Sequence, residues 1–192
     1  MRFLVDREKY YQDEAFYRYY WEKNGFNVGK DRCVILRGRK IKTDKHDNLY
    51  EYDRFWKYLY LDSYYLTEEC LDEYDSIIRD YNAKIIQAFP SSLYMLAKLY
   101  RLSGRTAPKF DKVFFSSENV YPEQKEFIAD VFGVTSLYNQ YGHSEKVLVA
   151  GQGGEFDGMA FENRASEVLG VYLGNASTTS EAKKNIELQN ES

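Results

Sequence analysis

Short apolar runs alternate with amphipathic segments along residues 33–142, and this alternation limits the folds open to the chain more than any other feature. The apolar runs are Cys33–Leu36 and the segments AKIIQAF, KVFFSS and TSLYNQY, and the segment FWKYLYLDSYYL is a further candidate strand. Strands that alternate with helices of about 10–15 residues are typical of right-handed βαβ units on a parallel sheet. The sequence therefore predicts an α/β fold.

The first and last predicted helices are marked by aromatic and apolar stripes and by clear stop signals. Between Asp6 and Asn24, aromatic residues fall on one side of a helix, which Gly25 would end. These aromatic residues are Tyr10, Phe16, Tyr17, Tyr20 and Trp21. Pro122 suits the first turn of another helix, which Gly133 would close.

Two more helices are predicted between the strands. One follows Thr67, a candidate N-cap, and the other follows Pro90, with Ser91 or Ser92 as its cap and Gly104 as its stop. Apolar residues repeat at helical spacing in both segments. They are Leu71, Tyr74, Ile78 and Tyr81 in the first, and Leu93, Leu96, Ala97 and Tyr100 in the second.

Charge and hydrophobicity exclude two classes of partner. The 192-residue chain has a formal net charge of −4, so it has no excess of positive charge to attract the phosphates of nucleic acid. No apolar run approaches the ~20 residues of a membrane span, and residues 1–14 do not have the pattern of a secretory signal. We therefore expect a cytoplasmic protein that does not bind nucleic acid.

The two cysteines lie far apart and in no metal-ligand spacing. Cys33 and Cys70 each belong to an apolar-periodic segment, which favours buried free thiols. The alternative is a cysteine nucleophile, which would need His46 or His143 as its partner. Buried thiols are the preferred interpretation.

The composition changes after residue 152. Residues 153–192 are rich in glycine and in small polar and charged residues, with little to bury. We expect residues 1–152 to form one folded unit and residues 153–192 to be a polar tail, partly disordered.

Two loops are candidates for a binding site. The segment SSEN, Ser116–Asn119, follows one predicted strand directly, and YGHSE, Tyr141–Glu145, follows the next. In open parallel sheets, ligands bind outside the carboxyl ends of the strands. Both loops are expected to reach that edge.

The second loop contains side chains that suit a nucleoside phosphate. Tyr141 can stack on a purine, Gly142 allows close backbone approach, Ser144 can donate to a phosphate oxygen, and Glu145 is an oxygen ligand suited to magnesium. The alternative is an ordinary turn followed by a solvated carboxylate at a helix start.

Three segments in order resemble the middle of an adenylate-forming ligase. They are FPSSLYMLAKLY, FDKVFFSSENVYPEQKEFIADVFG and LYNQYGHSEKVLVAG, and the resemblance covers roughly residues 1–152. The branch that they most resemble is the phenylacetate–coenzyme A ligase-like proteins, including the CapK-like group of capsular polysaccharide biosynthesis. The resemblance implies that the chain is part of the large AMP-binding domain.

The resemblance also implies site residues. It places Ser117, Glu118 and Asn119 on the adenine side of a nucleotide pocket, Asn139 and Gln140 along the base edge, Tyr141 against the adenine face, Ser144 near the α-phosphate and Glu145 on magnesium. Gly142 is also among the implied nucleotide-binding residues. His143 falls at a variable position of the motif and is expected to be structural or pocket-lining.

Such ligases join a carboxylate to the α-phosphate of ATP and pass the acyl group to coenzyme A or another acceptor. The resemblance therefore implies ATP, Mg²⁺ and a carboxylate substrate. The family's phosphate loop and catalytic lysine have no counterpart in this sequence, so we expect this chain to be inactive on its own. The alternatives are a non-catalytic remnant that binds a nucleotide or partner, and an aromatic-rich interaction protein.

Overall fold

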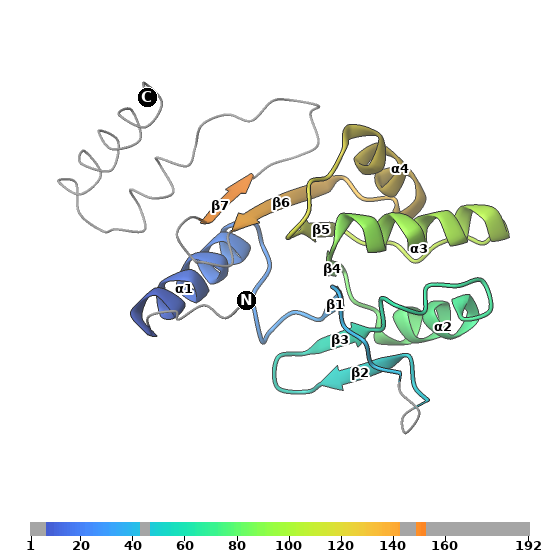
Figure 1. Ribbon diagram of the computed structural model, residues 1–192, viewed down its shortest axis with the longest axis horizontal. Helices are drawn as coiled ribbons and strands as arrows, with labels where there is room; N and C mark the ends of the chain where they lie inside the picture. The colour runs from blue at the N-terminus through green and yellow to red at the C-terminus, as the bar shows by residue number, and fades with distance from the viewer. Residues whose placement is uncertain (1–6, 43–46, 143–148, 153–192) are drawn as a thin grey trace.

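One sheet organises the part of the chain that the structure describes. The computed structural model describes residues 7–42, 47–142 and 149–152. Within these ranges there are seven strands in the order β2-β3-β1-β4-β5-β6-β7, together with four helices (Figure 1). The strands are β1 (Cys33–Leu36), β2 (Tyr50–Asp53), β3 (Tyr58–Leu61), β4 (Ile85–Ala88), β5 (Lys112–Phe115), β6 (Ser136–Gly142) and β7 (Val149–Gln152). The helices are α1 (Arg7–Lys23), α2 (Leu71–Tyr81), α3 (Pro90–Ser103) and α4 (Pro122–Phe132).

The predicted α/β class is confirmed. Strands β3, β1, β4, β5 and β6 are parallel, whereas β2 and β7 pair antiparallel at the two edges. The parallel strands are short apolar runs because side chains from both faces are buried, as β1 and β4 show along their whole length.

Helices cover the two faces of the sheet unequally. Helices α2, α3 and α4 pack on one face through a large core that includes Tyr74, Leu96 and Ile128. On the opposite face, Phe16 and Tyr20 of α1 join a smaller aromatic core with Phe114 and Tyr138. The rings of Phe114 and Tyr138 stack there with centroids 4.8 Å apart.

The predicted helix ends are confirmed, but two predicted helix starts are wrong. Gly25, Gly104 and Gly133 all follow helices with positive φ, the conformation that glycine adopts without strain. Helix α2 begins after Cys70 and not after Thr67. Of the two cysteines, which are both free, Cys33 is fully buried and Cys70 is only half-buried. The N-cap of α3 is Phe89, so neither Ser91 nor Ser92 caps it.

The strand predicted in FWKYLYLDSYYL is shorter than expected and has an unpredicted partner. Only Tyr58–Leu61 is strand, and it forms a hairpin with β2. The β2 sequence, YEYD, has no buried residue, so it lacks the apolar signal of the other strands.

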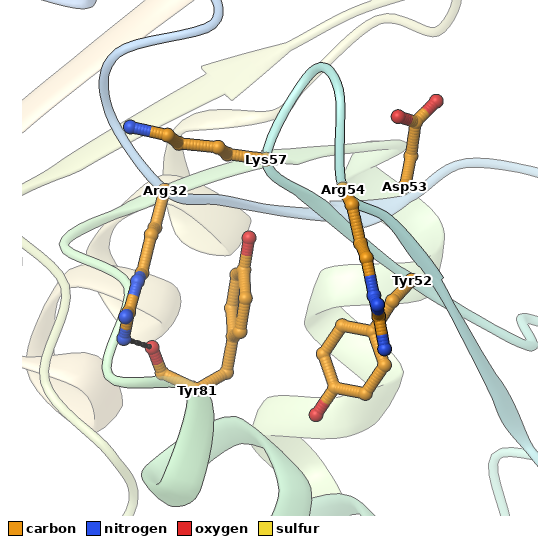
Figure 2. Close-up of a pocket in the computed structure, with 6 residues that line it drawn as sticks. All are labelled: Arg32, Tyr52, Asp53, Arg54, Lys57 and Tyr81. Carbon is orange, nitrogen blue, oxygen red and sulfur yellow. Dashed lines mark hydrogen bonds between the residues drawn. The ribbon is translucent and has the colours of Figure 1, made fainter.

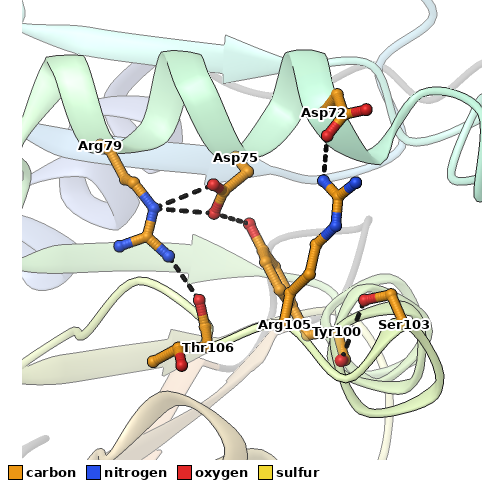
Figure 3. Close-up of polar contacts among 7 residues, drawn as sticks. All are labelled: Asp72, Asp75, Arg79, Tyr100, Ser103, Arg105 and Thr106. Atoms are coloured by element: carbon orange, nitrogen blue, oxygen red, sulfur yellow. Dashed lines mark hydrogen bonds and ion pairs between the residues drawn. The ribbon is translucent and has the colours of Figure 1, made fainter.

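A polar network ties α2 to α3 and to the loop before β5 (Figure 3). Asp75 accepts a hydrogen bond from the hydroxyl of Tyr100 at 3.0 Å and pairs with Arg79 at 2.9 Å. Arg79 also donates to the carbonyl of Thr106, and Arg105 pairs with Asp72 of α2. These contacts fix α2 and α3 relative to each other on one face of the sheet.

Candidate functional site

The two predicted loops follow neighbouring strands, as the sequence indicates. Strand β5 ends at Phe115, which pairs with Asn139 of β6 in parallel register. The backbone N–H of Ser116 donates to the carbonyl of Ala88 at 3.3 Å, which extends the ladder between β5 and β4 by one residue. The loop after β5 and the end of β6 therefore lie at the same carboxyl edge of the sheet.

The loop after β5 is attached to the start of α3. The carboxylate of Glu118 accepts hydrogen bonds from the backbone N–H of Ser91 at 3.0 Å and from its hydroxyl at 2.9 Å. The first N–H groups of a helix have no partner within the helix, and the helix dipole favours an anion there. Ser117, just before this anchor, has a φ of 67°, an uncommon conformation for a residue other than glycine.

Removing this anchor should loosen the loop without unfolding the protein. We expect Glu118→Ala to lower the free energy of unfolding by about 0.5–1 kcal/mol, because the contact is solvent-exposed. Urea unfolding measures this loss, and Ser91→Ala in the Glu118→Ala background should add little to it. Glu123→Ala, in the first turn of α4, is the control for loss of an exposed carboxylate. Fully additive effects of the Glu118 and Ser91 substitutions would contradict the contact.

Asn139 and Gln140 point to opposite faces of the sheet. Successive side chains of a strand alternate, and Leu137 belongs to the core under α2, α3 and α4 whereas Tyr138 belongs to the core under α1. Asn139 therefore lies on the face that carries Glu118 and α3, and Gln140 lies on the face that α1 covers. The structure therefore places Asn139 on the same face as Glu118 and places Gln140 on the opposite face, next to Ser116 at the start of the loop.

Several polar atoms near this edge are buried and have no hydrogen-bond partner. They are Ser116 Oγ, Asn139 Oδ1, Gln140 Nε2 and Gln87 Nε2. Buried polar side chains are nearly always hydrogen-bonded in folded proteins. The atoms of Ser116, Gln140 and Gln87 lie on the face that α1 covers, and Asn139 Oδ1 lies on the other face. Each face therefore has a place where a bound molecule or water could supply the missing partners.

Gln87 is not among the site residues predicted from the sequence, and Ser116 is predicted only as the first residue of a candidate loop, with no role of its own. A signal for Gln87 was present, because a glutamine within the apolar run IIQA of β4 is unusual for a strand buried on both faces. Ser116 had no comparable signal, since serine is common after a strand.

The remaining predicted residues follow Gln140. Tyr141 and Gly142 are the last residues of β6 and pair with Ala150 and Val149 of β7. Ser144, Glu145 and His143 lie outside the described residues. Among the described residues, no group of three or more histidine, cysteine, aspartate or glutamate side chains is arranged to hold a metal ion.

A surface pocket lies at the opposite end of the sheet, away from the predicted loops. It is lined by Arg32, Tyr52, Asp53, Arg54, Lys57 and Tyr81 (Figure 2). Arg32 precedes β1 and Lys57 precedes β3, which places the pocket at the amino ends of the parallel strands. Arg32 donates to the carbonyl of Tyr81 at 2.9 Å, and Lys57 donates to the carbonyl of Lys30 at 2.9 Å. Two of the three cationic side chains that line the pocket, Arg32 and Lys57, therefore already have protein partners.

No described helix combines the length and the apolar character that crossing a membrane would require. No protein-family model matches the chain, and no curated protein matches it significantly.

Comparison with solved structures gives matches to parts of longer chains. A structure of 2-hydroxyisobutyryl-CoA ligase in an open conformation with 2-HIB-AMP and CoA is 18% identical, with a TM-score of 0.49, and the match covers 76% of this chain and 32% of that one. VinN with L-aspartate is 17% identical, with a TM-score of 0.40, covering 60% of this chain and 28% of that one. IdnL7 is 15% identical, with a TM-score of 0.44, covering 74% and 29%. The chain thus spans about a third or less of the length of these structures.

Proposed function

We propose that this chain is part of an ATP-dependent adenylate-forming ligase, of the phenylacetate–coenzyme A ligase-like or CapK-like type, and that it supplies one wall of the nucleotide site. The observation that carries the proposal is the convergence of two motif segments. The loop Ser116–Asn119 and the end of β6, which resemble separate motifs of such ligases, lie at the carboxyl ends of adjacent parallel strands. This is the edge where open α/β sheets bind ligands.

The described residues at this edge suit a nucleoside. Asn139 Oδ1 is a buried acceptor without a partner, which matches the exocyclic amino group of adenine. Asn139 shares a face with Glu118, whose anchor on Ser91 holds the loop Ser117–Asn119 beside it. We therefore assign Ser117, Glu118, Asn119 and Asn139 to the nucleotide, and keep Gln140 apart because its side chain lies on the other face.

Tyr141, Gly142 and Ser144 complete the proposed nucleotide wall on the strength of the resemblance, with Glu145 on Mg²⁺. Magnesium in nucleotide sites is commonly held by one or two carboxylates together with phosphate oxygens. A single carboxylate at Glu145 is therefore enough for the proposed role. The bound nucleotide would supply the phosphate that activates a carboxylate, and coenzyme A or another acceptor would take the acyl group.

Titration with ATP and Mg²⁺ tests the proposal. We expect saturable binding to the wild-type chain and about tenfold weaker binding to Tyr141→Ala, because stacking of one base on an aromatic ring contributes ~1–3 kcal/mol. Isothermal calorimetry measures both dissociation constants.

The matched control is Tyr64→Ala, which removes an exposed tyrosine that follows β3. Strand β3 is separated from β6 by β1, β4 and β5, so this substitution should leave ATP binding unchanged. Equal binding of ATP to wild type and Tyr141→Ala, or no binding to either, would refute the nucleotide site. Carboxylate-dependent ATP–pyrophosphate exchange then separates a catalytic chain from one that only binds.

A further inference from the structure

Two glutamine side chains are buried on the face of the sheet that α1 covers, and the Nε2 atom of each has no hydrogen-bond partner. Gln87 of β4 is 2% exposed and Gln140 of β6 is 5% exposed, and Nε2 of each lacks a partner. Alternation along the strands places both on this face, because Ile85 and Tyr138 pack there.

Ser116 lies on the same face and directly follows β5, the strand between those of the two glutamines. Phe114 occupies this face one strand position earlier, and continuing its alternation turns the Ser116 side chain to the same side. Extending the register of β5 and β6 by one step puts Ser116 opposite Gln140. Ser116 Oγ is also buried without a partner.

We propose that Gln87, Ser116 and Gln140 bind an uncharged oxygen acceptor on the distal part of the carboxylate substrate. This inference rests on the proposed function, because it assumes that a carboxylate is presented to the nucleotide at the same edge. The two Nε2 groups can only donate, so they select a ligand oxygen. All three side chains are uncharged, so they match a ketone, amide or hydroxyl oxygen better than a second carboxylate.

The register also limits the length of the substrate. Gln87 pairs with Phe114, which is two residues before Ser116. The level of Gln87 and the level of Ser116 are therefore separated by ~7 Å along the strands. A carboxylate near the edge and an acceptor between these two levels, within reach of side chains from both, are therefore joined by a short chain of a few carbons. 4-Oxopentanoate has these features, and 4-methylpentanoate has the same shape without the acceptor.

Binding of these two acids to the 192-residue chain, without nucleotide, tests the inference. We expect 4-oxopentanoate to bind about tenfold or more tightly than 4-methylpentanoate, because a buried donor left unpaired disfavours the apolar acid. NMR titration of ¹⁵N-labelled protein gives both dissociation constants. It also follows the side-chain amide signals of Gln87 and Gln140, which should shift with 4-oxopentanoate only.

Gln87→Met and Gln140→Met keep the length of the side chain and remove the donor. Each should reduce the preference for 4-oxopentanoate to about twofold or less while leaving 4-methylpentanoate binding intact or improved. The side-chain amide signal that disappears in each variant is thereby assigned to the substituted glutamine. Gln124→Met, in the first turn of α4, is the matched control and should keep the full preference.

The outcomes separate this inference from the proposed function. If ATP binds but the two acids bind equally, or neither acid binds, the inference is wrong and the nucleotide site stands. If the preference for 4-oxopentanoate is present and lost in the methionine variants while ATP does not bind, the acceptor site stands and the ligase proposal falls. If ATP and the two acids all fail to bind, the proposed function and this inference are both wrong.

Discussion

Asp62→Ala should lower the free energy of unfolding by about 3 kcal/mol or more. The Asp62 carboxylate is fully buried and accepts three backbone hydrogen bonds, from Ile41 at 2.6 Å, Lys42 at 2.7 Å and Tyr64 at 2.8 Å. Each donor that is left buried without a partner costs ~1–3 kcal/mol. Chemical denaturation followed by circular dichroism measures the loss.

The position of Asp62 explains why the effect should be large. The residue follows β3 directly, and its carboxylate holds the segment that leaves β1 and leads to β2. Its backbone also takes part, because its N–H donates to Leu49 at 2.8 Å and its carbonyl accepts from the hydroxyl of Tyr74 at 2.7 Å. Loss of the carboxylate therefore loosens the connection between β1 and the hairpin β2–β3.

Asp53→Ala is the matched control for Asp62→Ala. Asp53 Oδ1 also accepts backbone hydrogen bonds, from Phe55 and Trp56 at 3.0 Å each, but Asp53 is only half-buried, at the end of β2 where the hairpin turn begins. Water can replace its carboxylate, so we expect a loss of less than about 1 kcal/mol. Similar losses for both substitutions would show that solvent reaches the donors around Asp62 and would contradict the prediction.

The sequence predicts those parts of the fold that local patterns control. Apolar runs of strand length, stripes at helical spacing and glycine stops are all local, and β1, β4, β5, β6 and the four helices lie where these patterns place them. The helix start at Cys70 has no local signal, since Cys70 has no capping side chain. Pro90 at the first position marks the start of α3, but its N-cap Phe89 likewise has no capping side chain. Ser91 looked like a cap, but its hydroxyl bonds to Glu118, which is distant in sequence.

Local sequence patterns likewise predict only part of the candidate site. The sequence predicts that two loops reach one edge, because that follows from strand order in a parallel sheet. It does not show that Asn139 and Gln140 separate to opposite faces, since this depends on where β6 begins and on which residues each face buries. Nor does it show that Asp62 and Gln87 are buried, because burial of a polar side chain depends on tertiary packing.

The second large effect is expected at high pH, where buried tyrosines should make the protein unfold. Burial raises the pKa of Tyr74, and nearby Asp62 raises it further. Burial likewise raises the pKa of Tyr100, with Asp75 as the next cause. Both side chains are at most 1% exposed, so the folded protein holds these phenol protons more tightly than the unfolded chain does.

The direction of the pH dependence follows from this difference. Below pH ~10, the ordinary tyrosine pKa, both states keep the protons and the stabilisation is fully present. Above it, the unfolded chain releases protons that the native state retains, so each of these two tyrosines should remove about 1.4 kcal/mol of stability per pH unit. Urea unfolding at a series of pH values from 8 to 12 measures the slope.

Tyr74→Phe should lower stability at pH 8 and raise it relative to wild type at high pH. The substitution loses the hydrogen bond to the Asp62 carbonyl, which costs about 1 kcal/mol, but it also removes one proton that the unfolded chain would release. The two effects should cancel near pH ~11, given a slope difference of about 1.4 kcal/mol per pH unit above pH ~10. Tyr64→Phe, at an exposed tyrosine, should follow the wild-type curve throughout. Parallel curves for wild type and Tyr74→Phe from pH 8 to 12 would mean that Tyr74 does not control the alkaline transition.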